Sequence, residues 1–321
     1  MAQLKIQTRK KLLPLSIAVA LGTFASNIHA SSVTINTSGS YTVGAGATPV
    51  TTSAALDSAV DTATSVQSSG YGSTVNNTSN ANYFTRGYTN GGFFARANGT
   101  SYGEAYNATS SITYVDTIFN NSGTAQNYTF DFNIIQGALS VYGTPTAAGD
   151  FAYADYSVNI FLTDSSGVST SIFSSAAQLN MDDTGTINFT GDTTLGGAYG
   201  GGNIYGWTNY TGSLDLGTFN AGDNFTLTYG MTANARGQIT SAPSGGTPTV
   251  GYGECGIECG EGGGVSGGSN SRTGDPFGVS GTGTTISSTP VSVPEASSVF
   301  LMGLGLAGLA ATRRRKSKLN G

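Results

Sequence analysis

The residues that could do chemistry in this 321-residue chain are two cysteines, a set of carboxylates and very few bases. The single histidine, His29, lies in the first 30 residues, which have the pattern of a removable leader. The rest of the chain therefore has no imidazole for general base catalysis, metal binding or nucleophile activation. Residues 31–293 also contain no lysine, which excludes Schiff-base chemistry there. We expect a protein that is not an enzyme and needs no cofactor or metal.

The two cysteines lie close together in a glycine-rich stretch, as Cys255-Gly-Ile-Glu-Cys259. The spacing is one residue too long for a redox Cys-x-x-Cys motif, and no further Cys or His could complete a zinc set. In an oxidising compartment we expect a structural disulfide, which would stabilise the fold by about 2–3 kcal/mol. Glu254, Glu258 and Glu261 could offer oxygen ligands to calcium, but a solvated acidic loop is the favoured interpretation.

Carboxylates leave one route to catalysis open. Glycoside hydrolysis needs only two carboxyl groups about 5–10 Å apart, and Glu104, Asp131 and Asp155 could supply such a pair. No motif supports this activity, because any acidic chain offers similar pairs. A glycoside hydrolase is therefore the least favoured function.

Aromatic residues suggest a different function, a carbohydrate-binding module. The rings that could line a concave sheet face are Tyr83, Tyr102, Tyr106 and Trp207. The stretch 91–109 could likewise form a strand with an exposed aromatic edge. Tyrosine and phenylalanine are more often buried in a sandwich than exposed at a binding site, since binding sites are few per protein.

The N-terminus has the three parts of a secretory signal peptide. Basic residues at positions 5, 9, 10 and 11 precede an apolar run over residues 12–25, and a small residue ends the segment. The run is shorter than the ~20 residues that a bilayer span requires. We expect residues 1–30 to be a signal peptide that signal peptidase removes between Ala30 and Ser31.

Trimming both ends changes the charge of the chain. Residues 31–293 carry four arginines against 17 acidic residues, a net charge of −13, whereas the whole chain has a net charge of −5. Such a surface repels a phosphate backbone, so nucleic acid is excluded as a partner. The same charge favours solubility after secretion.

Several segments of the chain alternate apolar and polar residues, and any functional site must be positioned by these segments. The alternation predicts strands within residues 110–119, 127–143 and 155–163, and two more within 212–237 that are joined by residues 220–223. It predicts an all-β fold, a single antiparallel β-sandwich of jelly-roll type over residues 31–246. Residues 54–66 have helical spacing and could be a helix or a loop beside a strand.

Glycine dominates the chain after this domain. From Thr247 to Gly283 the alternation stops, which predicts a long loop or flexible extension. We assign residues 247–291 to this glycine-rich loop together with a final strand or linker.

The last thirty residues, 292–321, have three parts of their own. Pro294 and Glu295 precede thirteen apolar or glycine residues at 299–311, and a basic cluster follows. The apolar stretch is too short for a permanent span, and the basic residues would hold it with the C-terminus inside the cell. We therefore expect a transmembrane helix at 299–311 that holds the chain in the inner membrane only transiently. The basic cluster comprises Arg313, Arg314, Arg315 and Lys316.

This three-part order resembles the PEP-CTERM sorting signal, with Ala296 where that family has a second proline. The resemblance implies a substrate of an exosortase, a membrane-embedded cysteine protease that cuts near the Pro-Glu step in Gram-negative bacteria that make exopolysaccharide and biofilm. It also implies a mature protein on the cell surface or outside the cell. We expect a non-enzymatic structural or adhesive protein associated with exopolysaccharide, with the carbohydrate-binding module as the alternative.

Overall fold

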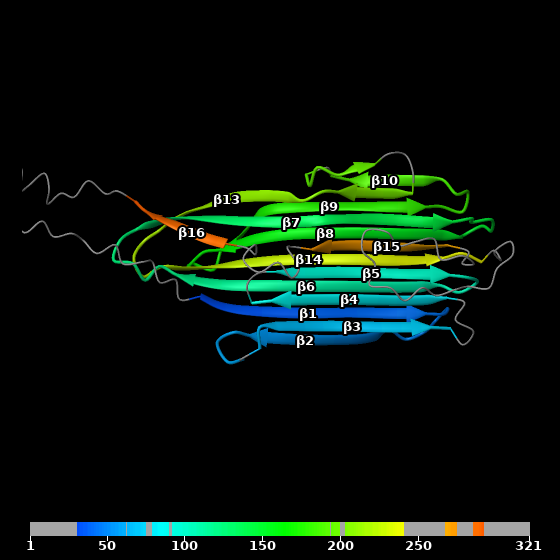
Figure 1. Ribbon diagram of the computed structural model, residues 1–321, viewed down its shortest axis with the longest axis horizontal. Helices are drawn as coiled ribbons and strands as arrows, with labels where there is room; N and C mark the ends of the chain where they lie inside the picture. The colour runs from blue at the N-terminus through cyan, green and yellow to red at the C-terminus, as the bar shows by residue number, and fades with distance from the viewer. Residues whose placement is uncertain are drawn as a thin grey trace, which may run out of the picture.

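The computed structural model describes residues 31–61, 63–74, 79–89, 92–192, 194–199, 203–240, 267–274 and 285–291. All regular elements among these residues are β-strands, and two antiparallel sheets pack face to face (Figure 1). This confirms the predicted all-β sandwich. The strands run along the long axis of the molecule, so the sandwich has two distinct ends.

The first sheet has seven strands in the order β10-β9-β8-β14-β6-β1-β2. Its strands are β1 Ser31–Val43, β2 Val50–Asp57, β6 Tyr106–Phe119, β8 Phe151–Thr163, β9 Ser169–Met181, β10 Ile187–Gly191 and β14 Asn224–Gln238.

The second sheet has nine strands, seven of them in the order β11-β12-β7-β15-β5-β4-β3. The strand β7 organises this sheet, because β12 and β13 lie one after the other along one of its edges, while β15 and β16 lie along the other. Its strands are β3 Ser65–Ser73, β4 Asn80–Tyr88, β5 Phe93–Ser101, β7 Gln126–Gly143, β11 Ala198–Tyr199, β12 Ile204–Trp207, β13 Tyr210–Phe219, β15 Gly267–Gly274 and β16 Thr285–Pro290.

The alternating apolar residues of the sequence form the core between the sheets, as predicted. In β7 the side chains of Tyr128, Phe130, Phe132 and Ile134 are buried, and the residues between them face outward. Each such side chain contributes about 1.5–3 kcal/mol when it leaves water. The strands predicted on either side of residues 220–223 are β13 and β14, but they belong to different sheets, so the turn crosses from one sheet to the other.

Glycines and tyrosines form complementary pairs in this core. A Cβ at Gly39 would lie 2.2 Å from the ring of Tyr83, and one at Gly99 would lie 2.1 Å from the ring of Tyr106. Glycine in a strand marks a place where another group approaches the backbone closely. Here the approaching group is an aromatic ring from another strand.

Of the two alternatives for residues 54–66, the structure supports the loop beside a strand and not the helix, because Val50–Asp57 is β2, which pairs along β1, and β3 begins at Ser65. A second expectation about local structure is wrong. The glycine-rich stretch is not a loop throughout, because Gly267–Gly274 is β15, an inner strand of the second sheet between β5 and β7. No apolar alternation marks β15, so its sequence gave no signal of a strand.

Within the residues described, no helix is long and apolar enough to cross a membrane. The expected membrane segment at 299–311 lies outside these residues.

Candidate functional site

Most residues that the sequence assigns to processing lie outside the described part of the chain. The exception is Ser31, which begins β1 and pairs with Ile118 of β6. The residues that lie outside the described part are Ala30, Cys255, Cys259, Pro294, Glu295, Arg313, Arg314 and Arg315, together with the candidate calcium ligands Glu254, Glu258 and Glu261.

The aromatic residues proposed for a sugar-binding face are mostly core residues, which corrects that prediction. Tyr83, Tyr106 and Trp207 are only 2%, 3% and 4% exposed. The indole Nε1 of Trp207 donates a hydrogen bond to the carbonyl oxygen of Ile135 at 3.1 Å. A ring that is packed inside the sandwich cannot stack on a sugar, and only Tyr102 of the four is partly exposed.

The three candidate catalytic carboxylates do not come together. Asp131 lies on β7, twelve residues before the end of that strand, which corresponds to about 40 Å along the sheet. Glu104 follows β5 near that far end, because Ser101 and Gly143 both pair with Gly267. Asp155 lies on β8 in the other sheet, where it accepts a hydrogen bond from Asn234 at 2.7 Å. Asp131 is therefore too far from Glu104 for glycoside hydrolysis, and Asp155 is hydrogen-bonded on a different sheet from Asp131.

A different set of residues converges on the outer surface of the second sheet. Asn82, Asn98 and Asn270 are direct register partners across β4, β5 and β15. Their side-chain carbonyl oxygens are all buried from solvent and accept no hydrogen bond. A buried acceptor without a partner costs about 1–3 kcal/mol. The asparagine row is therefore a set of polar groups that is closed to solvent.

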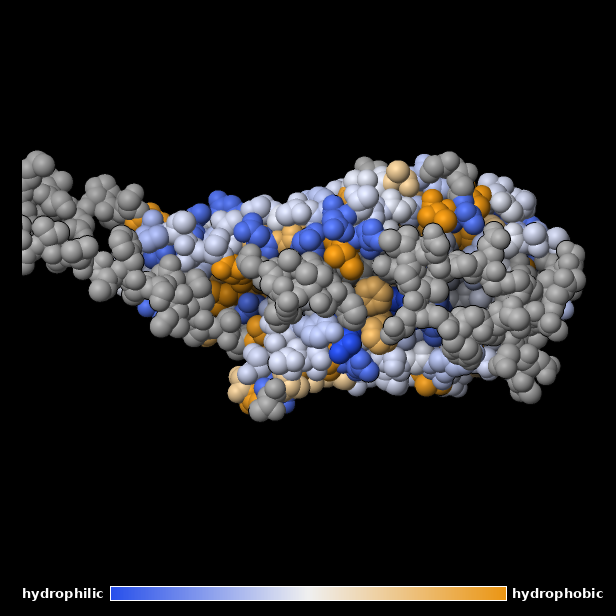
Figure 2. All heavy atoms as spheres, in the orientation of Figure 1, coloured by the Kyte–Doolittle hydropathy of each residue, from blue (hydrophilic) through white to orange (hydrophobic). Residues whose placement is uncertain are grey.

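Aromatic and guanidinium groups occupy the next two rows of the same surface. Phe84 is the register partner of Arg96, and Arg86 is the register partner of Phe94, so the two residue types alternate diagonally. The rings of Phe84 and Phe94 lie 6.1 Å apart, and the guanidinium of Arg86 lies 4.9 Å from the ring centroid of Tyr88. On the face of the molecule that is turned to the viewer in Figure 2, apolar (orange) and hydrophilic (blue) residues lie next to one another.

The charge of this surface is opposite to that of the chain. Strands β3, β4, β5 and β15 carry three of the four arginines of residues 31–293 and no Asp or Glu. In the backbone register, Arg96 of β5 pairs with Arg272 of β15. The Nε of Arg96 is buried and has no hydrogen-bond partner. We call this surface, defined by the asparagine row with Phe84, Phe94, Arg86 and Arg96, the arginine–asparagine face.

The outer surface of the first sheet is polar in a different way. Short hydroxyl side chains face each other across its strands, and two such pairs are Ser111 with Thr232 at 3.3 Å and Thr117 with Thr226 at 3.1 Å. The fourth arginine, Arg236, lies 4.2 Å from the ring centroid of Tyr153. These polar groups have partners within the sheet, so this surface offers fewer unsatisfied groups than the arginine–asparagine face.

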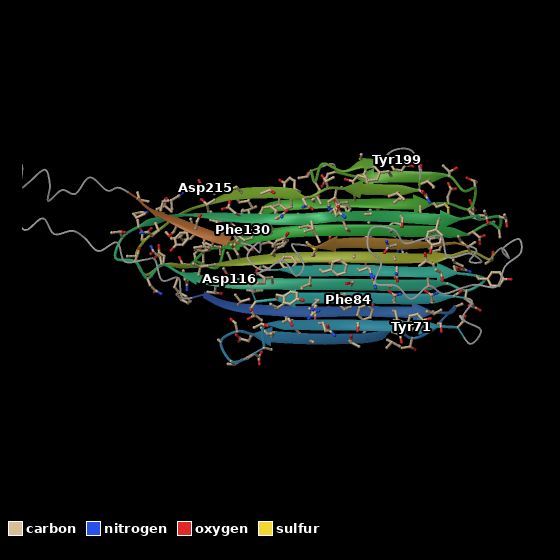
Figure 3. The ribbon with its side chains drawn as sticks, in the orientation of Figure 1. Tyr71, Phe84, Asp116, Phe130, Tyr199 and Asp215 are labelled. Atoms are coloured by element: carbon tan, nitrogen blue, oxygen red, sulfur yellow. The ribbon has the colours of Figure 1, made fainter. Side chains whose placement is uncertain are left out.

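One carboxyl group is buried in the core. Asp116 of β6 is 8% exposed and lies in register between Val33 and Leu227. Loss of hydration raises its pKa from 3.8 to about 6, and its Oδ1 accepts no hydrogen bond. Figure 3 shows Asp116 near one end of the sandwich, with Phe84 and Tyr71 farther along the strands. Within the described residues, no group of three His, Cys, Asp or Glu side chains could hold a metal ion.

The fold is an antiparallel β-sandwich, and a short segment that follows it in the sequence indicates how the chain is sorted. Residues 292–316 match the family described as the PEP-CTERM protein-sorting motif. The motif begins directly after Val291, the last described residue of the sandwich. The chain therefore carries the signal of an exported protein that an exosortase sorts to the cell surface of a Gram-negative bacterium. No curated protein matches the chain.

Proposed function

We propose that this exported sandwich is a non-enzymatic structural or adhesive protein of the cell surface or extracellular matrix, and that it binds exopolysaccharide at the arginine–asparagine face. The sorting motif supports export, and the separation of the candidate carboxylates argues against hydrolysis. The observation that carries the binding proposal is the alternation of arginine and phenylalanine at paired, partly exposed positions of β4 and β5, two strands without Asp or Glu.

These two residue types suit different parts of a sugar. The phenyl rings of Phe84 and Phe94 offer apolar surface to the C–H groups of a pyranose ring, whose burial is favourable. The guanidinium of Arg96 can form paired hydrogen bonds with a carboxylate. We therefore infer that the preferred polymer contains acidic sugars, because a chain with a net charge of −13 would repel an acidic polymer at most other places.

The experiment measures the affinity of the secreted protein for exopolysaccharide purified from the producing strain. The Arg96→Gln variant should bind about tenfold more weakly, since one charge-assisted interaction contributes ~1.4 kcal/mol or more. The matched control is Arg236→Gln, which removes the same charge from the opposite sheet and should leave the affinity unchanged.

Three results bear on the proposal in different ways. Equal affinities for Arg96→Gln and the unmodified protein would exclude this face as the binding surface. Equal binding to a neutral glucan would exclude the preference for acidic sugars. Reducing ends released from the polymer would exclude a non-enzymatic role. On cells, deletion of the protein should alter aggregation or biofilm formation.

A further inference from the structure

The first and last described residues of the sandwich, Ser31 and Val291, lie at the same end of the molecule. Each adjoins a segment that we expect to be removed by processing. Ser31 pairs with Ile118, close to the point where β6 ends. Val291 donates a hydrogen bond to the carbonyl oxygen of Ala125, just before β7 begins. The connection between β6 and β7, residues 120–125, therefore lies beside both exits (Figure 1). We call this the β6–β7 end.

The link between the sandwich and the expected membrane segment is short. Pro290 pairs with Gln126, the first residue of β7, so the strand pairing of the second sheet continues up to the end of the described chain. Eight residue steps separate Val291 from position 299, where the apolar stretch begins, and they span at most about 29 Å when fully extended. The β6–β7 end therefore cannot be farther than this from the lipid while the tail is in the membrane.

The last strand, β16, sets the direction in which the chain leaves the sandwich. β16 runs antiparallel to β7 along the long axis, so the chain leaves the sandwich along that axis. Pro290 and Pro294 restrict the backbone on both sides of the exit. The strand β7 has 18 residues, which corresponds to about 60 Å from this end of the sandwich to the other.

We propose that the β6–β7 end faces the lipid bilayer before the tail is removed, and that the strands stand away from the membrane surface. The arginine–asparagine face is then held clear of the lipid, because its rows lie level with residues 135–140 of β7, nine to fourteen residues or about 30–45 Å along the strand from Gln126. This inference rests on the proposed function in one respect, which is that residues 299–311 lie in the membrane.

The test uses the full chain from Ser31 to Gly321 in phosphatidylethanolamine–phosphatidylglycerol vesicles, with both native cysteines replaced by serine. A single fluorophore is attached to Asn121→Cys at the β6–β7 end, Ala47→Cys at the opposite end, or Ser69→Cys on β3. All three positions are exposed. Lipids with a spin-labelled headgroup serve as the quencher. We expect quenching at Asn121→Cys that is several-fold stronger than at the other two positions.

The outcomes separate the orientation from the membrane anchor. Equal quenching at Asn121→Cys and Ser69→Cys would mean that the arginine–asparagine face lies flat on the membrane. Stronger quenching at Ala47→Cys would mean that the opposite end of the sandwich faces the lipid. Either result overturns the proposal while the anchor stands. Failure of the chain to float with the vesicles would instead overturn the anchor itself. The same variants ending at Val291 serve as the control and should show no quenching at any position.

Discussion

Val291 donates its backbone N–H to the carbonyl oxygen of Ala125 at 3.0 Å, immediately before the first residue of the matched sorting motif. The sandwich is therefore hydrogen-bonded up to the sorting motif. We expect the exosortase to cut near Pro294 and Glu295, within a few residues of folded protein, because a residue before a proline favours the extended backbone that a protease binds.

The sorting motif should control release of the protein. We expect the Pro294→Ala/Glu295→Ala double variant to keep its tail and to stay with the membrane fraction, because the step read by the exosortase is lost. The mass of the protein on the surface and in the medium gives both cut sites for the unmodified chain. Equal processing and release of the two proteins would contradict the assignment of the motif.

The contact between Gly39 and Tyr83 should make a single methyl group costly. We expect Gly39→Ala to lower the free energy of unfolding by about 1–3 kcal/mol, because the new Cβ would meet the ring at 2.2 Å and the carbonyl oxygen of Thr109 at 2.7 Å. Gly123→Ala is the matched control, since nothing lies within 4 Å of a Cβ there. Urea unfolding of the three proteins measures the difference. A neutral effect of Gly39→Ala would show that the ring moves aside at little cost.

The burial of Trp207 separates its structural role from sugar binding. Trp207→Phe leaves the carbonyl oxygen of Ile135 without its indole donor and reduces contact with Tyr156, whose ring centroid lies 4.5 Å away. We expect the free energy of unfolding to fall by about 1–3 kcal/mol in this variant, with no change in its affinity for polysaccharide. Denaturant unfolding followed by circular dichroism measures the free energy of unfolding, and a binding assay measures the polysaccharide affinity. Weaker binding at unchanged stability would restore Trp207 as a ligand contact.

The buried Asp116 should make stability fall with rising pH. Its pKa is about 6 in the folded protein and 3.8 without burial, so the folded state holds the proton more tightly. The stability that this group contributes is complete below the lower pKa and is lost as the pH rises through the higher one. Between about pH 5 and about pH 7.5 we expect a loss of roughly 1–2 kcal/mol in the free energy of unfolding.

The Asp116→Asn variant supplies the comparison for this pH dependence. It cannot ionise, so its free energy of unfolding should change less over the same pH range and should exceed that of the unmodified protein at the upper pH. Denaturant titrations at the two pH values measure both effects. Parallel pH profiles for the two proteins would show that Asp116 does not ionise within this range.

The sequence was sufficient to predict the strands whose buried side chains alternate with polar ones. Tyr128, Phe130, Phe132 and Ile134 of β7 are an example, since a two-residue period places them all on one face of a sheet. The tail was also recognisable, because its order of proline, apolar stretch and basic cluster is local in the sequence.

The strand β15 and the asparagine row could not be predicted, for a common physical reason. The inward residues of β15 include Ser269 and Ser271, which are held by hydrogen bonds to the Tyr106 hydroxyl and to the carbonyl oxygen of Asp155. Such contacts leave no apolar pattern in the sequence. The asparagines meet only because the register of β4, β5 and β15 aligns them, and register depends on partners that are distant in the chain.

The position of β15 has a consequence for biogenesis. This strand inserts between β5 and β7, yet it is synthesised after both of them and after the whole first sheet. Strand pairings between distant parts of a chain form late, since the intervening loop must be closed first. While residues 267–274 are still on the ribosome, the chain therefore cannot complete its second sheet, even though every strand of the first sheet has already been synthesised.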